Sequence, residues 1–75
     1  MTKTFNLTEE QFLIITQAIN EFELSGKANN TMIAQNVNRK KLINETIVRL
    51  TITTHEDTFQ DLVDYINTHL KNGKL

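Results

Sequence analysis

Four basic residues near the middle of the chain are the side chains best suited to contact another macromolecule. Arg39, Lys40 and Lys41 are consecutive, and Arg49 follows on the same stretch, NTMIAQNVNRKKLINETIVRL, residues 30–50. A short helix, a turn and a second helix with a basic start would let these groups meet the phosphates and base edges of DNA. The stretch is about two residues shorter than the usual helix-turn-helix. We therefore take Arg39, Lys40, Lys41 and Arg49 as candidate macromolecule-binding residues.

Residues for catalysis or metal binding are few. The two histidines, His55 and His69, lie on one predicted helix, where a rise of about 1.5 Å per residue separates them by about 21 Å. They cannot share a metal ion within that helix. Gly26 and Gly73 are the only glycines, and both resemble helix stops, so no phosphate-binding glycine loop is present. We expect a protein that is not an enzyme, with no cofactor, no metal and no small-molecule substrate.

Charge is distributed unevenly along the chain. The formal net charge is −1, yet residues 27–50 carry five cations and one carboxylate, a net charge of +4. Residues 1–26 and 51–75 carry net charges of −3 and −2. A basic middle between acidic flanks makes DNA a possible partner, provided that the acidic segments point away from the duplex.

Composition limits the class of protein. The chain has 75 residues and no cysteine, so we expect one small domain, 1–75. Because no disulfide can stabilise its small core, oligomerisation is the remaining common source of added stability. The longest apolar run, residues 12–15, is far shorter than a membrane span, and no basic-then-apolar leader opens the chain. We expect a cytoplasmic protein with no membrane partner. Asn and Thr are abundant, which suggests an AT-rich source such as a phage or plasmid.

Two amphipathic helices are predicted near the ends of the chain. Thr8 and Gln11 form a capping box for a helix over residues 8–24, and Gly26 ends it. Its apolar residues form one stripe. Acidic first-turn residues and apolar residues at helical spacing predict a second helix over residues 55–71, with Thr53 or Thr54 as its N-cap.

The middle of the chain is harder to assign. Residues 31–50 fit one straight helix poorly, whereas a break near residues 36–38 leaves helices at 31–36 and 39–50 with a consistent apolar face. We therefore expect an all-α bundle of three to four helices. The alternative is an α+β fold with short strands near 4–7 and 48–53, where β-branched and polar residues alternate.

Exposed apolar side chains indicate where a partner could bind. Leu13 and Leu24 lie opposite the main stripe of the first predicted helix, and Tyr65 lies at the edge of the stripe of the last one. These three residues are candidate dimer or partner contacts. We expect a small regulatory protein that binds a protein partner, as a homodimer. The alternative is a helix-turn-helix-like DNA-binding regulator that uses residues 31–50.

Overall fold

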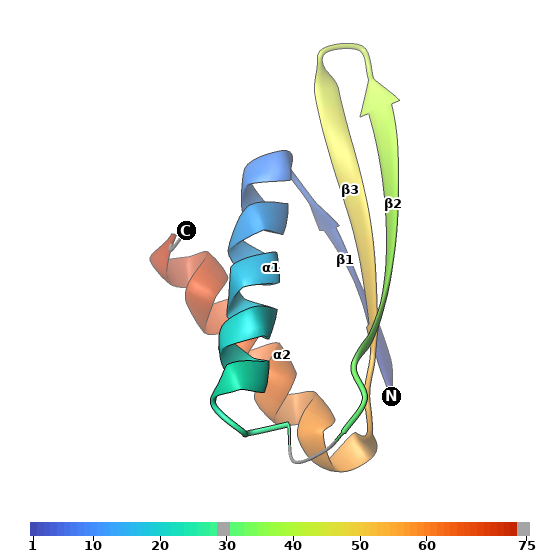
Figure 1. Ribbon diagram of the computed structural model, residues 1–75. Coiled ribbons are helices and arrows are strands. Elements are labelled where there is room, and N and C mark those ends of the chain that lie inside the picture. The colour runs from blue at the N-terminus through green and yellow to red at the C-terminus, as the bar shows by residue number, and fades with distance from the viewer. Residues whose placement is uncertain (29–30, 74–75) are drawn as a thin grey trace.

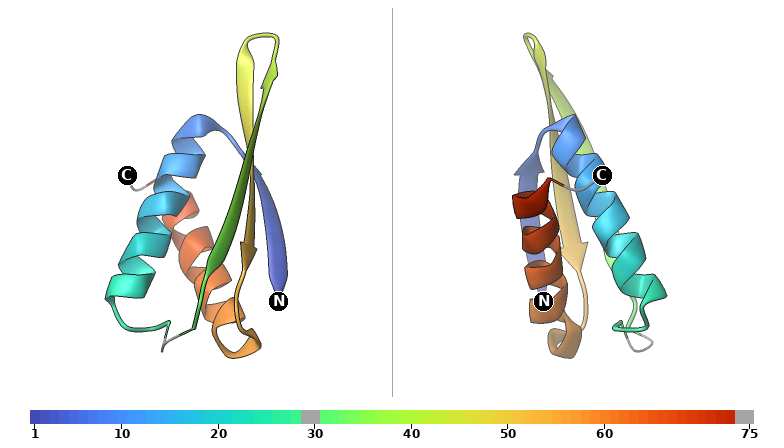
Figure 2. Two further views of the ribbon diagram at one scale, coloured as in Figure 1. Left: turned by 45° about the vertical axis from the view of Figure 1, so that its right-hand side comes forward. Right: turned by 90° about the vertical axis from the view of Figure 1, so that its left-hand side faces the viewer.

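The computed structural model describes residues 1–28 and 31–73, and this part of the chain is an α+β protein. The elements are β1 (Thr2–Leu7), α1 (Glu9–Leu24), β2 (Ala34–Leu42), β3 (Glu45–Thr53) and α2 (Glu56–Asn72). The strands form an antiparallel sheet in the order β1-β3-β2, and both helices lie on the same face of it (Figures 1 and 2). The prediction of an all-helical bundle is therefore wrong.

Both terminal helices form where their periodicity predicts them. At the start of α1, the Thr8 hydroxyl accepts the backbone N–H of Gln11, and the Gln11 side chain accepts the backbone N–H of Thr8, each at 3.1 Å. The capping box is thus confirmed, and Gly26 follows the helix with a left-handed φ of 77°. The N-cap of α2 is His55 rather than Thr53 or Thr54, and its C-cap, Gly73, is also left-handed.

The predicted helices at 31–36 and 39–50 are wrong, because residues 31–33 have no regular structure and residues 34–50 belong to the hairpin of β2 and β3. The α+β alternative is correct for residues 4–7 and 48–53, since Phe5 pairs with Leu50 and Leu7 with Val48. Strand β3 is rich in β-branched residues, which favour extended backbone. Burial of its alternate side chains against the helices outweighs the weak helical periodicity of the same residues.

One core lies between the sheet and the helix layer. From β3 it takes Val48, Leu50 and Ile52, which are almost fully buried. The other buried apolar residues of this core come from β1, α1, the segment after α1 and α2: Phe5, Leu7, Ile15, Ala18, Ile19, Phe22, Ala28, Leu62 and Ile66. The sheet is therefore held by contacts on one face only.

The β2–β3 hairpin extends beyond the start of α1 as an arm (Figure 1). Leu42 pairs with Glu45, so the turn consists of Ile43 and Asn44. Ile43 is 94% exposed and has a positive φ of 42°, which is unfavourable for a β-branched residue.

No helix among the described residues is long and apolar enough to cross a membrane.

Candidate nucleic-acid interface

The candidate interface is the face of the sheet that the helices leave uncovered, which we call the open face. Successive side chains of a strand point to opposite faces. Since Val48, Leu50 and Ile52 point to the helices, Ile47, Arg49 and Thr51 point to the open face. Register then assigns the neighbours of these residues, and the open face also includes Thr4, Asn6, Asn36, Asn38 and Lys40.

Polar side chains form cross-strand rows on the open face. The hydroxyl oxygens of Thr2 and Thr53 lie 3.1 Å apart, as do those of Thr4 and Thr51. In the next row, Asn6 of β1 and Asn38 of β2 both stand opposite Arg49 of β3. A guanidinium between two amides is thus presented on a surface of uncharged polar groups.

The open face is hollowed next to Arg49. A cavity of about 510 Å³ is lined by residues of all three strands: Asn6, Asn38, Arg39, Lys40, Leu42, Ile47 and Arg49. Asn6, Asn38, Lys40 and Arg49 supply hydrogen-bond donors and positive charge there, and the described lining residues include no carboxylate. The hollow therefore suits an anionic surface that also carries hydrogen-bonding groups.

Strand alternation divides the cations that the sequence places together. Lys40 and Arg49 point to the open face, whereas Arg39 points to the helix side, where its Nε donates to Glu9 Oε1 at 3.3 Å. The Arg39 guanidinium also lies 4.9 Å from the centre of the Phe12 ring. Lys41 shares the face of Arg39 by alternation. Arg39 therefore secures the arm to α1, and Lys40 and Arg49 remain for an external partner.

Charge is separated by layer across the whole fold. The helices carry eight of the nine acidic residues: Glu9, Glu10, Glu21, Glu23, Glu56, Asp57, Asp61 and Asp64. The strands carry Lys3, Arg39, Lys40, Lys41 and Arg49 against Glu45 alone, a net charge of +4. Because both helices cover one face, their carboxylates lie on the far side of the sheet from the open face.

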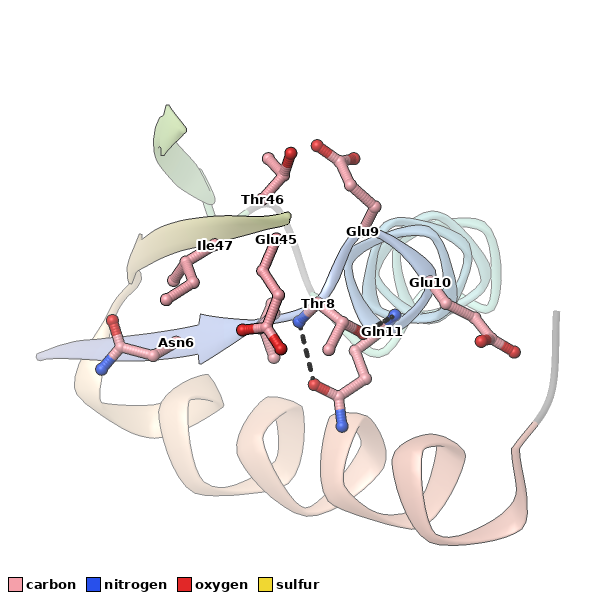
Figure 3. Close-up of a pocket in the computed structure, with 9 residues that line it drawn as sticks. Asn6, Thr8, Glu9, Glu10, Gln11, Glu45, Thr46 and Ile47 are labelled. Carbon is pink, nitrogen blue, oxygen red and sulfur yellow. Dashed lines mark hydrogen bonds between the residues drawn. The ribbon is translucent and has the colours of Figure 1, made fainter. Parts of the chain in front are cut away.

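A second cavity, of about 620 Å³, lies where β1 leads into α1 (Figure 3). Glu9, Glu10 and Glu45 line it, together with the Thr8–Gln11 capping box. Glu9 is already paired with Arg39. The described residues contain no group of histidine, cysteine and acidic side chains able to hold a metal ion. The carboxylates that line this second cavity would repel an anionic partner, so the open face is the better nucleic-acid surface.

The buried His69 and the half-buried Glu21 and Tyr65 join the two helices. The His69 ring lies between two oxygens, with Nε2 at 2.9 Å from Glu21 Oε2 and Nδ1 at 2.9 Å from the Tyr65 carbonyl oxygen. The Tyr65 hydroxyl donates to the same Glu21 oxygen at 3.2 Å, and its ring packs against Phe22. Tyr65, expected at an interface rim, thus contributes to contacts within the chain.

The Tyr65 phenol should titrate at unusually high pH. Desolvation, the hydrogen bond to Glu21 and the charge of Glu21 raise its pKa above the ordinary 10.0. The pKa of Tyr65 is higher in the folded protein than in the unfolded chain, so the protonated phenol contributes to the stability of the fold. This contribution is complete below about pH 10 and is lost as pH rises through the folded pKa. Tyr65 is the only tyrosine and tryptophan is absent, so tyrosinate absorbance reports it alone.

The titration compares the midpoint of Tyr65 in three samples. We expect a midpoint above 10.0 for the folded protein, a smaller elevation for Glu21→Gln, and the ordinary value in urea. The Glu21→Gln variant keeps part of the elevation because desolvation is the largest cause. A folded midpoint at or below the urea value would contradict the described contacts.

The other predicted contact residues lie on α1. Leu13 is 59% exposed and lines a groove between α1 and β2, and Leu24 is 79% exposed near the end of the helix. The structure does not bring them together with the basic residues. Sequence reasoning missed Asn6 and Asn36, which only sheet register places beside Arg49 and Lys40. The chain matches no protein family model, no curated protein and no solved structure.

Proposed function

We propose that this protein binds double-stranded DNA through the open face of its sheet. The separation of charge by layer carries the proposal, because it leaves Lys40 and Arg49 on a sheet face turned away from the eight carboxylates of the helices. A net charge of −1 does not oppose such binding when eight of the nine carboxylates belong to the helices on the far side and Glu45 alone belongs to the sheet. The basic middle of the sequence thus acts as a strand surface, not as a helix-turn-helix.

The open face holds side chains of the two kinds that DNA recognition uses. Lys40 and Arg49 supply cations for phosphates, whose neutralisation provides most of the affinity. Asn36 and Asn38 lie beside them on β2, and an asparagine amide reads adenine through two hydrogen bonds in the major groove. A two-stranded β-ribbon fits that groove, and the β2–β3 arm is such a ribbon.

A duplex is favoured over a single strand because of where the aromatic side chains lie. Single strands are bound largely by stacking of bases on aromatic rings. Phe5 faces the core, and the other four aromatic residues belong to the helices: Phe12, Phe22, Phe59 and Tyr65. Double-stranded RNA has a major groove too deep and narrow for a ribbon, which leaves DNA.

Binding of a protein partner, the first expectation from the sequence, stays a prediction. Leu13 and Leu24 are exposed, as that function requires, but scattered exposed leucines are common on soluble proteins. The open face combines charge, amides and a hollow, so it is the more specific feature.

Fluorescence anisotropy with a labelled duplex tests the proposal. Two phosphate contacts per protomer, made by Lys40 and Arg49, predict a slope of about −2 for the logarithm of affinity against the logarithm of salt concentration. The same sequence as a single strand should bind more weakly. Absence of binding at low salt, affinity independent of salt, or preference for the single strand would contradict the proposal.

A further inference from the structure

The free edge of β2 is a second surface suited to binding, and it is distinct from the open face. Strand β2 lies at the end of the sheet order β1-β3-β2 and spans nine residues, all of them exposed. It contains no proline, and its pairing with β3 is continuous from Ala34 to Leu42. Exposed edges of this kind offer unpaired backbone groups to another strand.

Hydrogen bonds at the start of the sheet show which residues of β2 have free backbone groups. Met1 and Thr54 bond to each other in both directions, at 2.7 and 3.0 Å. Since bonding alternates along an antiparallel pair, even-numbered residues of β3 face β1 and odd-numbered ones face β2. The register then directs even-numbered residues of β2 to β3. Gln35, Val37, Arg39 and Lys41 therefore point their N–H and C=O groups to the free edge.

We propose that β2 pairs antiparallel with β2 of a second copy, about a two-fold axis at Asn38. Asn38 is the midpoint of β2, so this register pairs all four edge-facing residues. Val37 lies opposite Arg39 of the second copy, and Gln35 lies opposite its Lys41. No cation opposes a cation, although lysines on an edge ordinarily disfavour pairing.

The groove between α1 and β2 supplies charge complementarity for the second copy. It is lined by Leu13, Glu23 and Gln35 with neighbouring polar residues of α1. In the proposed register, Lys41 of the second copy stands opposite Gln35 on the helix side, next to the groove that contains Glu23. The same approach brings the second copy over Leu13, a residue with the exposure expected of a dimer contact.

Such a dimer would join two open faces into one. The axis is perpendicular to the sheet, so both helix layers stay on the same side and the sheet becomes six-stranded. Two sets of Asn36, Asn38 and Lys40 then lie together around the axis on one continuous surface. The dimer itself rests on the edge geometry and not on the proposed function, and its test contains no DNA.

Engineered disulfides test the register directly, since the chain has no cysteine of its own. Even-numbered residues form the close, non-hydrogen-bonded pairs of the new interface, with Cα atoms about 4.5 Å apart. That distance suits a disulfide. Asn38→Cys should therefore link two copies rapidly under mild oxidation.

Two further variants serve as matched controls for the linkage. Residue 36 lies opposite residue 40 of the second copy, so Asn36→Cys alone and Lys40→Cys alone should link slowly, whereas a mixture of the two should link rapidly. Linking of Asn36→Cys alone as fast as Asn38→Cys would overturn the register. Failure of Asn38→Cys to link would overturn it as well.

A proline substitution tests the dimer in solution. Light scattering should give twice the monomer mass for the native protein and the monomer mass for Val37→Pro, whose lost N–H points to the free edge. Asn36→Pro is the matched control, since it removes an N–H that faces β3 and should disrupt the hairpin itself. A native protein that is monomeric at all concentrations, or a Val37→Pro variant that stays dimeric, would overturn the proposal.

Discussion

Replacement of Phe22 by alanine should remove most of the protein's free energy of unfolding at room temperature. Phe22 is fully buried where the helices meet, and its ring centre lies 5.6 Å from that of Tyr65. Truncation of a buried phenylalanine costs about 3–5 kcal/mol, because apolar contacts are lost and a cavity remains. Small domains have total stabilities of only about 5 kcal/mol or somewhat more. The variant should therefore lose most or all of its free energy of unfolding.

Leu24→Ala is the matched control for Phe22→Ala, two positions further along the same helix. Leu24 is exposed, so its truncation should change the free energy of unfolding by less than about 0.5 kcal/mol. Urea denaturation followed by circular dichroism measures both. A Phe22→Ala variant within about 1 kcal/mol of the native protein would show that the helices do not meet around this side chain.

The terminal helices could be predicted from sequence because local signals agree there. Thr8, Gln11 and Gly26 mark the limits of α1, and Gly73 marks the end of α2. Between these limits the apolar residues recur with helical period and are buried by the fold. Local propensity and tertiary packing therefore favour the same structure.

Strand β2 could not be predicted because it carries no two-residue pattern. Both of its faces are exposed, so apolar and polar residues do not alternate along AQNVNRKKL. The turn after it, Ile43–Asn44, lacks the glycine that usually marks a two-residue hairpin. Leu42 and Ile43 follow the helical period of the next residues by coincidence, since both are exposed near the tip of the arm.

The candidate site was predicted in part. The sequence identifies Lys40 and Arg49 as cations available to a partner, but it groups them with Arg39, which the fold pairs with Glu9. Neighbours in a strand point to opposite faces, so a run of basic residues divides between two surfaces. The amides of Asn6 and Asn38 join the site only through long-range pairing, which a single sequence does not reveal.

The most direct test of the account is charge reversal on the open face, measured by duplex affinity at low salt. Lys40→Glu with Arg49→Glu removes two charge-assisted contacts worth about 1.5 kcal/mol each, so affinity should fall about a hundredfold. Lys27→Glu with Lys71→Glu changes net charge equally but outside the sheet, and should change affinity by less than about threefold. Unchanged affinity in the first pair, or equal losses in both, would contradict DNA binding by the open face.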